Sequence, residues 1–149
     1  MENNFLAYAE DALNYGVMGT LVLMSIITLW LFIERMMFYS SVNIDTYKHR
    51  DSLEIDLTDN ISTISAIGSN APYIGLLGTV LGIMLTFYSM GDVGAVDAKK
   101  IMMGLALALK ATAMGLVVAI PAIITYTIAL RKVERILTKF DIAQDQKEL

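Results

Sequence analysis

The feature that most constrains this sequence is a run of 22 residues without a charge, from Ala12 to Ile33. As a helix this run would extend about 33 Å, and the hydrocarbon core of a bilayer is roughly 30 Å thick. The whole chain is 149 residues long, 56% hydrophobic and only 17% charged. These values predict a membrane protein. They leave too little chain for a separate catalytic domain, so we do not expect an enzyme.

A cleaved signal peptide is the alternative interpretation of this first run. A signal peptide begins with basic residues and has an apolar core of roughly 7–15 residues. The first eleven residues contain Glu2, Glu10 and Asp11 but no lysine or arginine, and the apolar run is longer than such a core. The sequence therefore favours a first membrane span over residues 12–33.

A second charge-free run extends over 32 residues, from Asn60 to Gly91, which is too long for one crossing. Pro72 divides it, because proline disfavours the interior of a helix. Three isoleucines recur at helical spacing before the proline, which predicts an amphipathic helix at the membrane interface, and residues 72–91 then form the second span. The third span covers residues 101–130, with Lys110 as its only charge.

The basic residues predict the orientation, since they gather on the inner side of a membrane protein. Eight lie after the first and third spans, and only Lys99 and Lys100 lie between the second and third. The N-terminus therefore faces out. Both flanks, residues 1–11 and 131–149, have an apolar helical face, which indicates interfacial helices or continuations of the neighbouring spans. The predicted segments are an amphipathic N-terminus (1–11), span one (12–33), an inner loop with an amphipathic helix (34–71), span two (72–91), an outer loop (92–100), span three (101–130) and an inner tail (131–149).

Small residues form a stripe on one face of each later span. The stripes are Gly75, Thr79, Gly82 and Thr86 in span two, and Ala108, Thr112, Gly115, Ala119 and Ala122 in span three. Small residues let membrane helices approach closely, which explains the glycines and alanines as packing residues. A threonine hydroxyl can bond back to its own helix, or it can line a narrow polar lumen. Both interpretations of the threonines remain open.

Ionisable side chains are scarce in the spans. Lys110 is 21 residues, or about 32 Å, before Arg131, which places it near the outer edge of the membrane. Its amine can then reach the headgroups, or it can contact a partner. Glu34 and Arg35 are expected to anchor the inner end of span one. No carboxylate lies inside a span, so a chain that uses protons would take its proton carrier from another subunit.

Metal, disulfide and nucleic-acid chemistry is not expected. The chain has no cysteine and one histidine, His49, and its net charge is −4. One copy therefore cannot supply paired histidine or thiolate ligands. Nothing in the sequence indicates a cofactor.

Two motifs carry a resemblance to a known family. Residues 71–84 read APYIGLLGTVLGIM, and residues 104–123 read GLALALKATAMGLVVAIPAI. Together they resemble the signature of the MotA/TolQ/ExbB proton-channel family, in its ExbB and TolQ branch. The chain is most similar to a short ExbB.

The resemblance implies an all-α inner-membrane protein with a periplasmic N-terminus and a cytoplasmic C-terminus. Family members form a homo-oligomeric ring, usually a pentamer, around a partner of the ExbD or TolR type. The membrane aspartate of that partner takes up and releases protons, and the motion drives TonB or TolA. By resemblance, Thr79 and Thr112 are lumen-facing threonines, and Pro72 and Pro121 shape their helices. Thr86 extends the same stripe.

The sequence departs from the family pattern in two ways. Leu107 stands where the family often has a glutamate, and Lys110 replaces an apolar residue. The resemblance therefore implies that the partner supplies the only proton-carrying acid. The loop between spans one and two is also far shorter than in typical members, which predicts a reduced cytoplasmic helical bundle.

Three other functions fit parts of the sequence. A TolQ-like subunit of the Tol envelope system belongs to the same mechanical class as the ExbB-like transducer. A pore-forming holin fits the length and hydropathy but leaves both motifs unexplained. A purely structural membrane scaffold predicts no loss of function when the threonine hydroxyls are removed.

Overall fold

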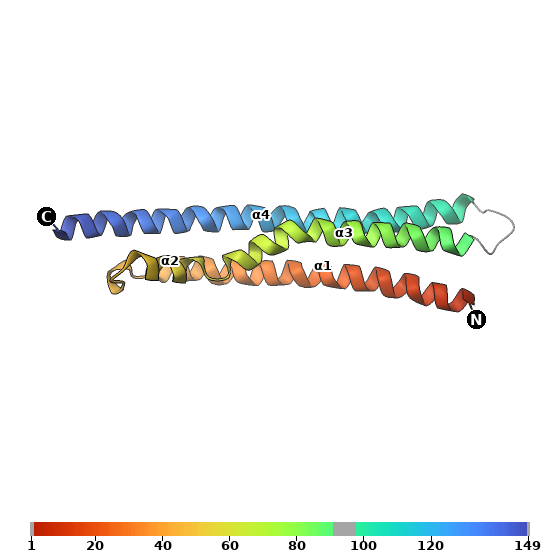
Figure 1. The fold of residues 1–149 in the computed structure, drawn as a ribbon, viewed down its shortest axis with the longest axis horizontal. Helices are drawn as coiled ribbons and strands as arrows, with labels where there is room; N and C mark the ends of the chain where they lie inside the picture. The colour runs from red at the N-terminus through yellow and green to blue at the C-terminus, as the bar shows by residue number, and fades with distance from the viewer. Residues whose placement is uncertain (1, 91–97, 149) are drawn as a thin grey trace.

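The computed structural model describes residues 2–90 and 98–148, and all regular elements in these ranges are helices. Three long helices lie side by side along one axis, with the chain ends at opposite ends of the bundle (Figure 1). This confirms the predicted all-α fold. The elements in chain order are α1 (Glu2–Ser41), the short 3₁₀ helix η1 (Ile44–Thr46), α2 (Arg50–Thr58), α3 (Ile61–Met90) and α4 (Ala98–Glu148).

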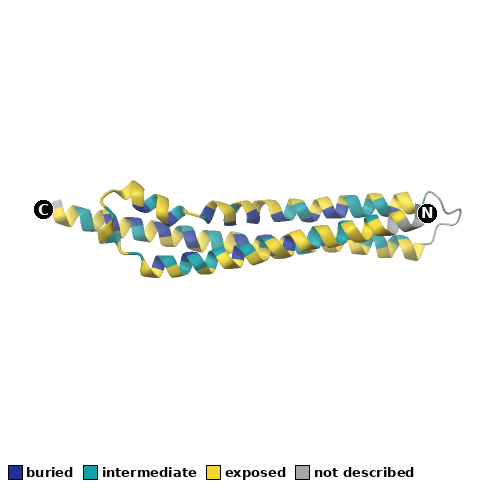
Figure 2. Ribbon diagram, turned by 90° about the horizontal axis from the view of Figure 1, so that it is seen from below, coloured by how far each residue is buried: buried dark blue, intermediate teal, exposed yellow. Residues whose placement is uncertain are grey.

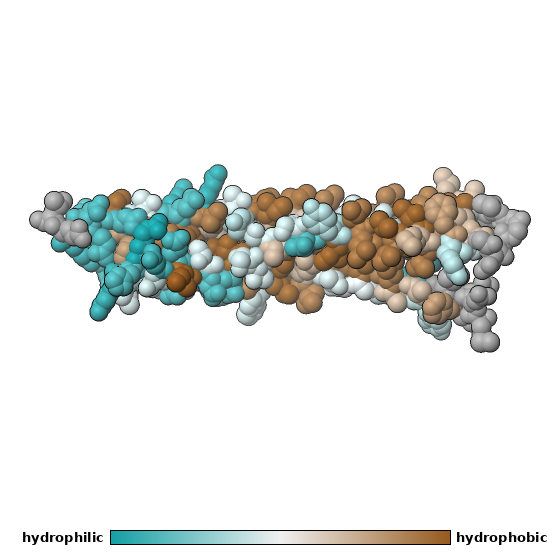
Figure 3. All heavy atoms as spheres, viewed as in Figure 1, coloured by the Kyte–Doolittle hydropathy of each residue, from teal (hydrophilic) through white to brown (hydrophobic). Residues whose placement is uncertain are grey.

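Large apolar side chains cover much of the outer surface of these helices. Trp30 in α1 is 72% exposed and Val117 in α4 is 60% exposed, which is unfavourable in water but suits lipid. On the face that Figure 3 shows, apolar residues dominate the middle of the bundle, and polar residues gather at the end that carries α2. All three long helices are long and apolar enough to cross a membrane. The chain is therefore a multi-pass membrane protein.

Both flanking segments are continuous with their neighbouring spans. Residues 2–11 form the first turns of α1, and residues 131–148 form the last turns of α4. The separate N-terminal interfacial helix, one of two interpretations of that segment, is not a separate element. No proline or glycine interrupts the chain at either junction, so nothing ends the helix there. Most of the predicted outer loop lies outside the described residues, and Lys99 and Lys100 already belong to α4.

The predicted helix boundary at Pro72 is wrong, because α3 runs through it without interruption. Proline lacks the N–H that would bond to the carbonyl of Gly68. Membrane helices tolerate this loss because neighbouring helices and local adjustments compensate for it. In Figure 1 the first turns of α3 cross from the side of α1 to α4, and the remaining turns run along α4. Pro121 likewise lies inside α4.

The segment predicted as an inner loop is a small helical cap on the polar end of the bundle. Leu53 and Leu57 of α2 are fully buried against α4. Asn60 joins α2 to α3 in the left-handed region with φ 60, which asparagine tolerates better than most residues. Buried residues concentrate where the helices face each other (Figure 2). The cluster at this end contains Tyr39, Leu53, Leu57, Ile61, Ala129, Val133, Leu137 and Phe140.

Candidate functional site

The backbones of α3 and α4 touch at two glycines. A Cβ on Gly75 would lie 2.6 Å from the carbonyl oxygen of Ala111, and one on Gly115 would lie 2.7 Å from that of Ala71. Real Cβ atoms do not approach backbone this closely, so only glycine allows the contact. Gly82 continues it, since a Cβ there would lie 2.9 Å from the Ala108 methyl group. These three residues therefore pack α3 on α4, as small residues do in membrane proteins.

The close approach buries a pair of hydroxyls between the helices. Thr79 Oγ1 lies 2.5 Å from Thr112 Oγ1 and 2.9 Å from the carbonyl oxygen of Ala108. Each hydroxyl has one proton to donate and can accept bonds in return. In one arrangement Thr112 donates to Thr79, which donates to Ala108. Thr79 is 7% exposed, whereas Thr112 is half-buried. The pair of hydroxyls therefore extends from the buried centre of the helix contact to its partly exposed margin.

Thr86 lies on the same face of α3 but is not part of this pair. Its hydroxyl donates to the carbonyl of Gly82 at 2.8 Å, within its own helix. A Cβ on Gly104 would lie 2.5 Å from Thr86 Oγ1, so Gly104 makes room for the threonine. Thr86 therefore packs the outer part of the α3 and α4 contact. In a single chain, both Thr79 and Thr86 face α4.

The remaining predicted residues lie at the margin of this contact or away from it. Pro72 is half-buried, and Pro121 is exposed on α4. Lys110 is exposed and lies two residues, or about 200°, from Thr112 around the helix. Its side chain therefore leaves α4 on a different side from the hydroxyl pair. Its predicted contact with lipid or a partner stays a prediction.

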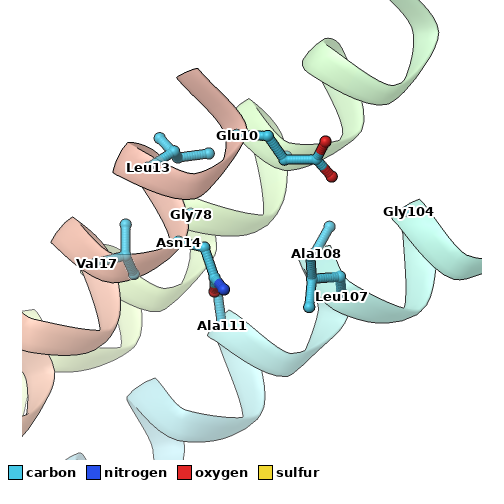
Figure 4. Close-up of a pocket in the computed structure, with 10 residues that line it drawn as sticks. Glu10, Leu13, Asn14, Val17, Gly78, Gly104, Leu107, Ala108 and Ala111 are labelled. Carbon is cyan, nitrogen blue, oxygen red and sulfur yellow. The ribbon is translucent and has the colours of Figure 1, made fainter. Parts of the chain in front are cut away.

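A small cavity of ≈ 20 Å³ lies where α1, α3 and α4 meet. This is room for about one water molecule. Glu10 and Asn14 extend into it from α1 toward α4 (Figure 4). Sequence reasoning missed both residues because they lie at the edge of the first charge-free run. Their i, i+4 spacing, which puts them on one helix face, was the available signal. The other lining residues are Leu13, Val17, Gly78, Gly82, Gly104, Leu107, Ala108 and Ala111.

Arg35 is buried at the polar end of α1, whereas the sequence predicted a simple interfacial anchor. Its guanidinium donates to the carbonyl of Asp56 at 3.1 Å and to Glu34 Oε1 at 2.5 Å. The guanidinium also lies over the ring of Phe38, 4.9 Å from the ring centre. The Tyr39 hydroxyl donates to the carbonyl of Leu57 at 2.9 Å. Arg35 and Tyr39 therefore fasten the end of α1 to the cap formed by α2.

The contact between α3 and α4 offers hydroxyls rather than ionisable side chains in the part of the chain that the structure describes. Residues 2–90 and 98–148 contain no group of three histidine, aspartate or glutamate residues that could hold a metal ion. The α3 and α4 contact contributes hydroxyls, carbonyls and glycine backbone. Such a contact can pass or position a proton through hydroxyls, but it has no carboxylate to carry one.

Comparisons with known proteins agree with these features. A sequence profile described as the MotA/TolQ/ExbB proton channel family matches residues 30–142. The chain is 51% identical over 137 residues to a biopolymer transport protein ExbB of Helicobacter pylori, covering 92% of this chain and 94% of the relative. It is 49% identical over 132 residues to an ExbB of Aquifex aeolicus, covering 89% of each. A TolQ of Pseudomonas aeruginosa is 36% identical over 93 residues, which are 62% of this chain and 40% of that protein.

Proposed function

This chain belongs to the MotA/TolQ/ExbB proton channel family, and we propose that it is a proton-motive-force transducing subunit of the ExbB type. Copies of it form a ring, with a pentamer expected, around the membrane helix of an ExbD-like partner. An aspartate of that partner carries the protons. The motion that results acts on a TonB-like protein and energises import across the outer membrane.

The observation that carries this proposal is the hydroxyl pair of Thr79 and Thr112 in a contact without a carboxylate. Hydroxyls can hold water or face a titrating side chain, but they do not themselves store a proton at ordinary pH. The resemblance implies a glutamate at the position of Leu107 in many family members, and here leucine leaves this contact without an acid of its own. Glu10 of α1 lines the cavity beside this contact but not the hydroxyl pair. We therefore infer that the acid that meets the pair comes from a second chain, and the half-buried Thr112 is the member of the pair that can meet it.

Small steps fit the energy that protons provide. Each unit charge that crosses 100 mV releases about 2.3 kcal/mol, so several protons per step are needed for large work. The small residues of α3 and α4 pack these two helices on each other within one chain, so a partner helix meets the margin of this contact, where the half-buried Thr112 lies.

We infer an inner-membrane location with the N-terminus in the periplasm. Eight of the eleven basic residues lie at the α2 end of the bundle or in segments next to it, and this end has the polar surface. Basic residues near membrane helices stay on the cytoplasmic side. The α2 end is therefore cytoplasmic, and the end with the N-terminus is periplasmic.

Purification and complementation test this function together. We expect the tagged chain, extracted from its own membrane, to bring with it a small single-span protein with a membrane aspartate. In cells that lack both proteins, the two genes together should restore energised uptake, and an asparagine at the partner's aspartate should abolish it. Self-association without such a partner would overturn the transducer and favour a holin-like or scaffold protein.

The similarity to a TolQ supports one second candidate, a TolQ-like subunit of the Tol envelope system. The same complementation strain separates the two candidates. Restored uptake without restored envelope integrity indicates the ExbB-like role. Restored envelope integrity without uptake indicates the TolQ-like role.

A further inference from the structure

We propose that neighbouring copies of this chain join head to tail through two charged faces at the cytoplasmic end, an acidic face on α2 and a basic face on α4. This inference rests on the ring of the proposed function and names the surface that closes it. The acidic face consists of Asp51, Ile55 and Asp59, and the basic face consists of Arg131, Arg135 and Lys139.

The acidic face is the outer side of α2 together with Asp59, the residue that caps its C-terminal end. Asp51, Ile55 and Asp59 follow at steps of four residues, and all three are exposed, with Ile55 at 70%. The opposite side of α2 carries Leu53 and Leu57, which are fully buried. Residues 50–59 contain four acids and one arginine, a net charge of −3.

The basic face is the outer side of α4 in its last third. Arg131, Arg135 and Lys139 also follow at steps of four and are exposed. Within the described part of the chain, none of the three forms an ion pair. Residues 131–139 contain four basic residues and Glu134, a net charge of +3. The basic face thus matches the acidic face in size and opposes it in charge.

Both faces lie at the same height along the bundle. The salt bridge between Arg50 and Asp141, at 3.3 Å, aligns the start of α2 with this part of α4. Further along, a Cβ on Gly68 would lie 3.3 Å from the backbone nitrogen of Ile123. The chain runs antiparallel to α4 between these two contacts. Interpolation then aligns Asp59 with Arg131, Ile55 with Arg135 and Asp51 with Lys139, each to within about one residue.

Equal height matters because of ring symmetry. Rotation about an axis along the membrane normal moves a copy sideways but leaves every residue at its height. Two different surfaces can close a ring only if they lie at one height and on different sides of the chain. The buried sides of α2 and α4 share one cluster, so their outer faces look away from each other. The two charged faces satisfy both conditions.

A hollow on the acidic side can receive a long basic side chain. Its volume is ≈ 200 Å³, and it is lined by Arg35, Phe38, Ile55, Asp56 and Asp59. The guanidinium of Arg35 is already engaged with Glu34. The carboxylate of Asp56 accepts a hydrogen bond from the Tyr47 hydroxyl at 2.8 Å and that of Asp59 one from the Asn60 amide at 3.4 Å, but among the described residues neither is paired with a cation, so both charges can attract one. A lysine or arginine stem can lie on apolar side chains while its charge meets a carboxylate. We assign the hollow to Arg131 of a neighbouring copy.

Cysteine crosslinking tests this interface directly, because the chain has no cysteine of its own. We expect D59C combined with R131C, oxidised in isolated membranes, to give a ladder of covalent dimers, trimers and larger species up to a closed ring. A bond within one chain would give no ladder, and a single cysteine gives dimers at most. The matched control joins D59C with K147C, 16 residues farther along α4, and should give no ladder.

Charge reversal provides a second test that does not depend on a disulfide. D59R should lower the fraction of assembled ring about two- to fivefold at low salt, which is the size of effect expected from the loss of one exposed ion pair. Adding R131D to D59R should restore the ring. D11R reverses an exposed acid at the other end and should have no effect. An intact ring without the ladder or the rescue would overturn this interface alone. Single copies in native mass measurements would overturn the ring of the proposed function as well.

Discussion

The hydroxyl oxygens of Thr79 and Thr112 lie 2.5 Å apart across the contact between α3 and α4. Thr79 lies in span two and Thr112 in span three. Their hydroxyls meet because the two backbones touch at Gly75, four residues before Thr79, and at Gly115, three residues after Thr112. Packing and chemistry are therefore coupled at this point. The glycines determine the separation of the helices, and that separation determines whether the hydroxyls bond.

Replacing both threonines by valine separates the chemical role from the packing role. Valine keeps the shape of threonine and removes the hydroxyl. Hydrogen bonds between membrane helices average about 0.6 kcal/mol, so we expect the double variant to lose no more than about 1–2 kcal/mol of stability. We expect energised uptake to fall at least tenfold, because the partner's acid then faces a wall without hydroxyls. Uptake in cells and ring formation in detergent measure the two effects.

Thr127→Val is the matched control for this pair. Thr127 lies on the same helix, is exposed, and donates only to the carbonyl of Ile123 in its own helix. Uptake in this variant should equal that of the unmodified chain. Undiminished uptake in the Thr79 and Thr112 double variant would argue that the hydroxyl pair serves packing alone.

Gly75→Ala should force α3 and α4 apart. The new methyl group would lie 2.6 Å from the carbonyl oxygen of Ala111. Because this oxygen belongs to the backbone of α4, the clash can be relieved only if the helix itself moves. Overpacking of this kind costs about 1–3 kcal/mol. Gly19→Ala in α1 is the control, since a Cβ there meets nothing within 4 Å, and it should be neutral or stabilise by about 0.4–1 kcal/mol. Thermal unfolding in one detergent compares the two, and equal midpoints would contradict the close contact.

Much of this architecture follows from the sequence because lipid imposes simple requirements. Charge-free runs of sufficient length predicted all three long helices, and small residues at helical spacing predicted the faces that α3 and α4 bury against each other. The predicted break at Pro72 was wrong, since a rule derived from soluble helices overstates the cost of proline in a membrane helix.

The cap at the polar end could not be read from spacing alone. The sequence predicts an interfacial anchor at Arg35, because its partner, the carbonyl of Asp56, is a backbone group 21 residues away that no pattern reveals. Glu10 and Asn14 were overlooked for a similar reason. Their cavity exists only where three helices meet, and its other walls are formed by Leu13, Val17 and Leu107 together with glycines and alanines, so no single helix face reveals it.

Arg35→Lys should loosen the cap although it keeps the positive charge. A lysine amine cannot donate to both Glu34 and the Asp56 carbonyl in the geometry of a planar guanidinium, nor stack as well on Phe38. We expect a loss of about 1–3 kcal/mol, the cost of leaving a buried polar group unpaired. Hydrogen exchange should accelerate in α2, residues 50–58, and stay slow where α3 meets α4. Lys132→Arg, a change at an exposed position, is the control, and unchanged exchange in α2 would contradict a fastening role for Arg35.

The inferred orientation predicts which end of the bundle a reagent outside the inner membrane can reach. Phe5 is 72% exposed at the N-terminal end, and Gln146 is exposed at the other end. In spheroplasts, a maleimide that cannot cross membranes should label Phe5→Cys at once. It should label Gln146→Cys only after the membrane is opened, because the basic residues near that end hold it in the cytoplasm. The unmodified chain has no cysteine and provides the blank. The reverse pattern of labelling would place the α2 cap in the periplasm and would reverse the proposed orientation.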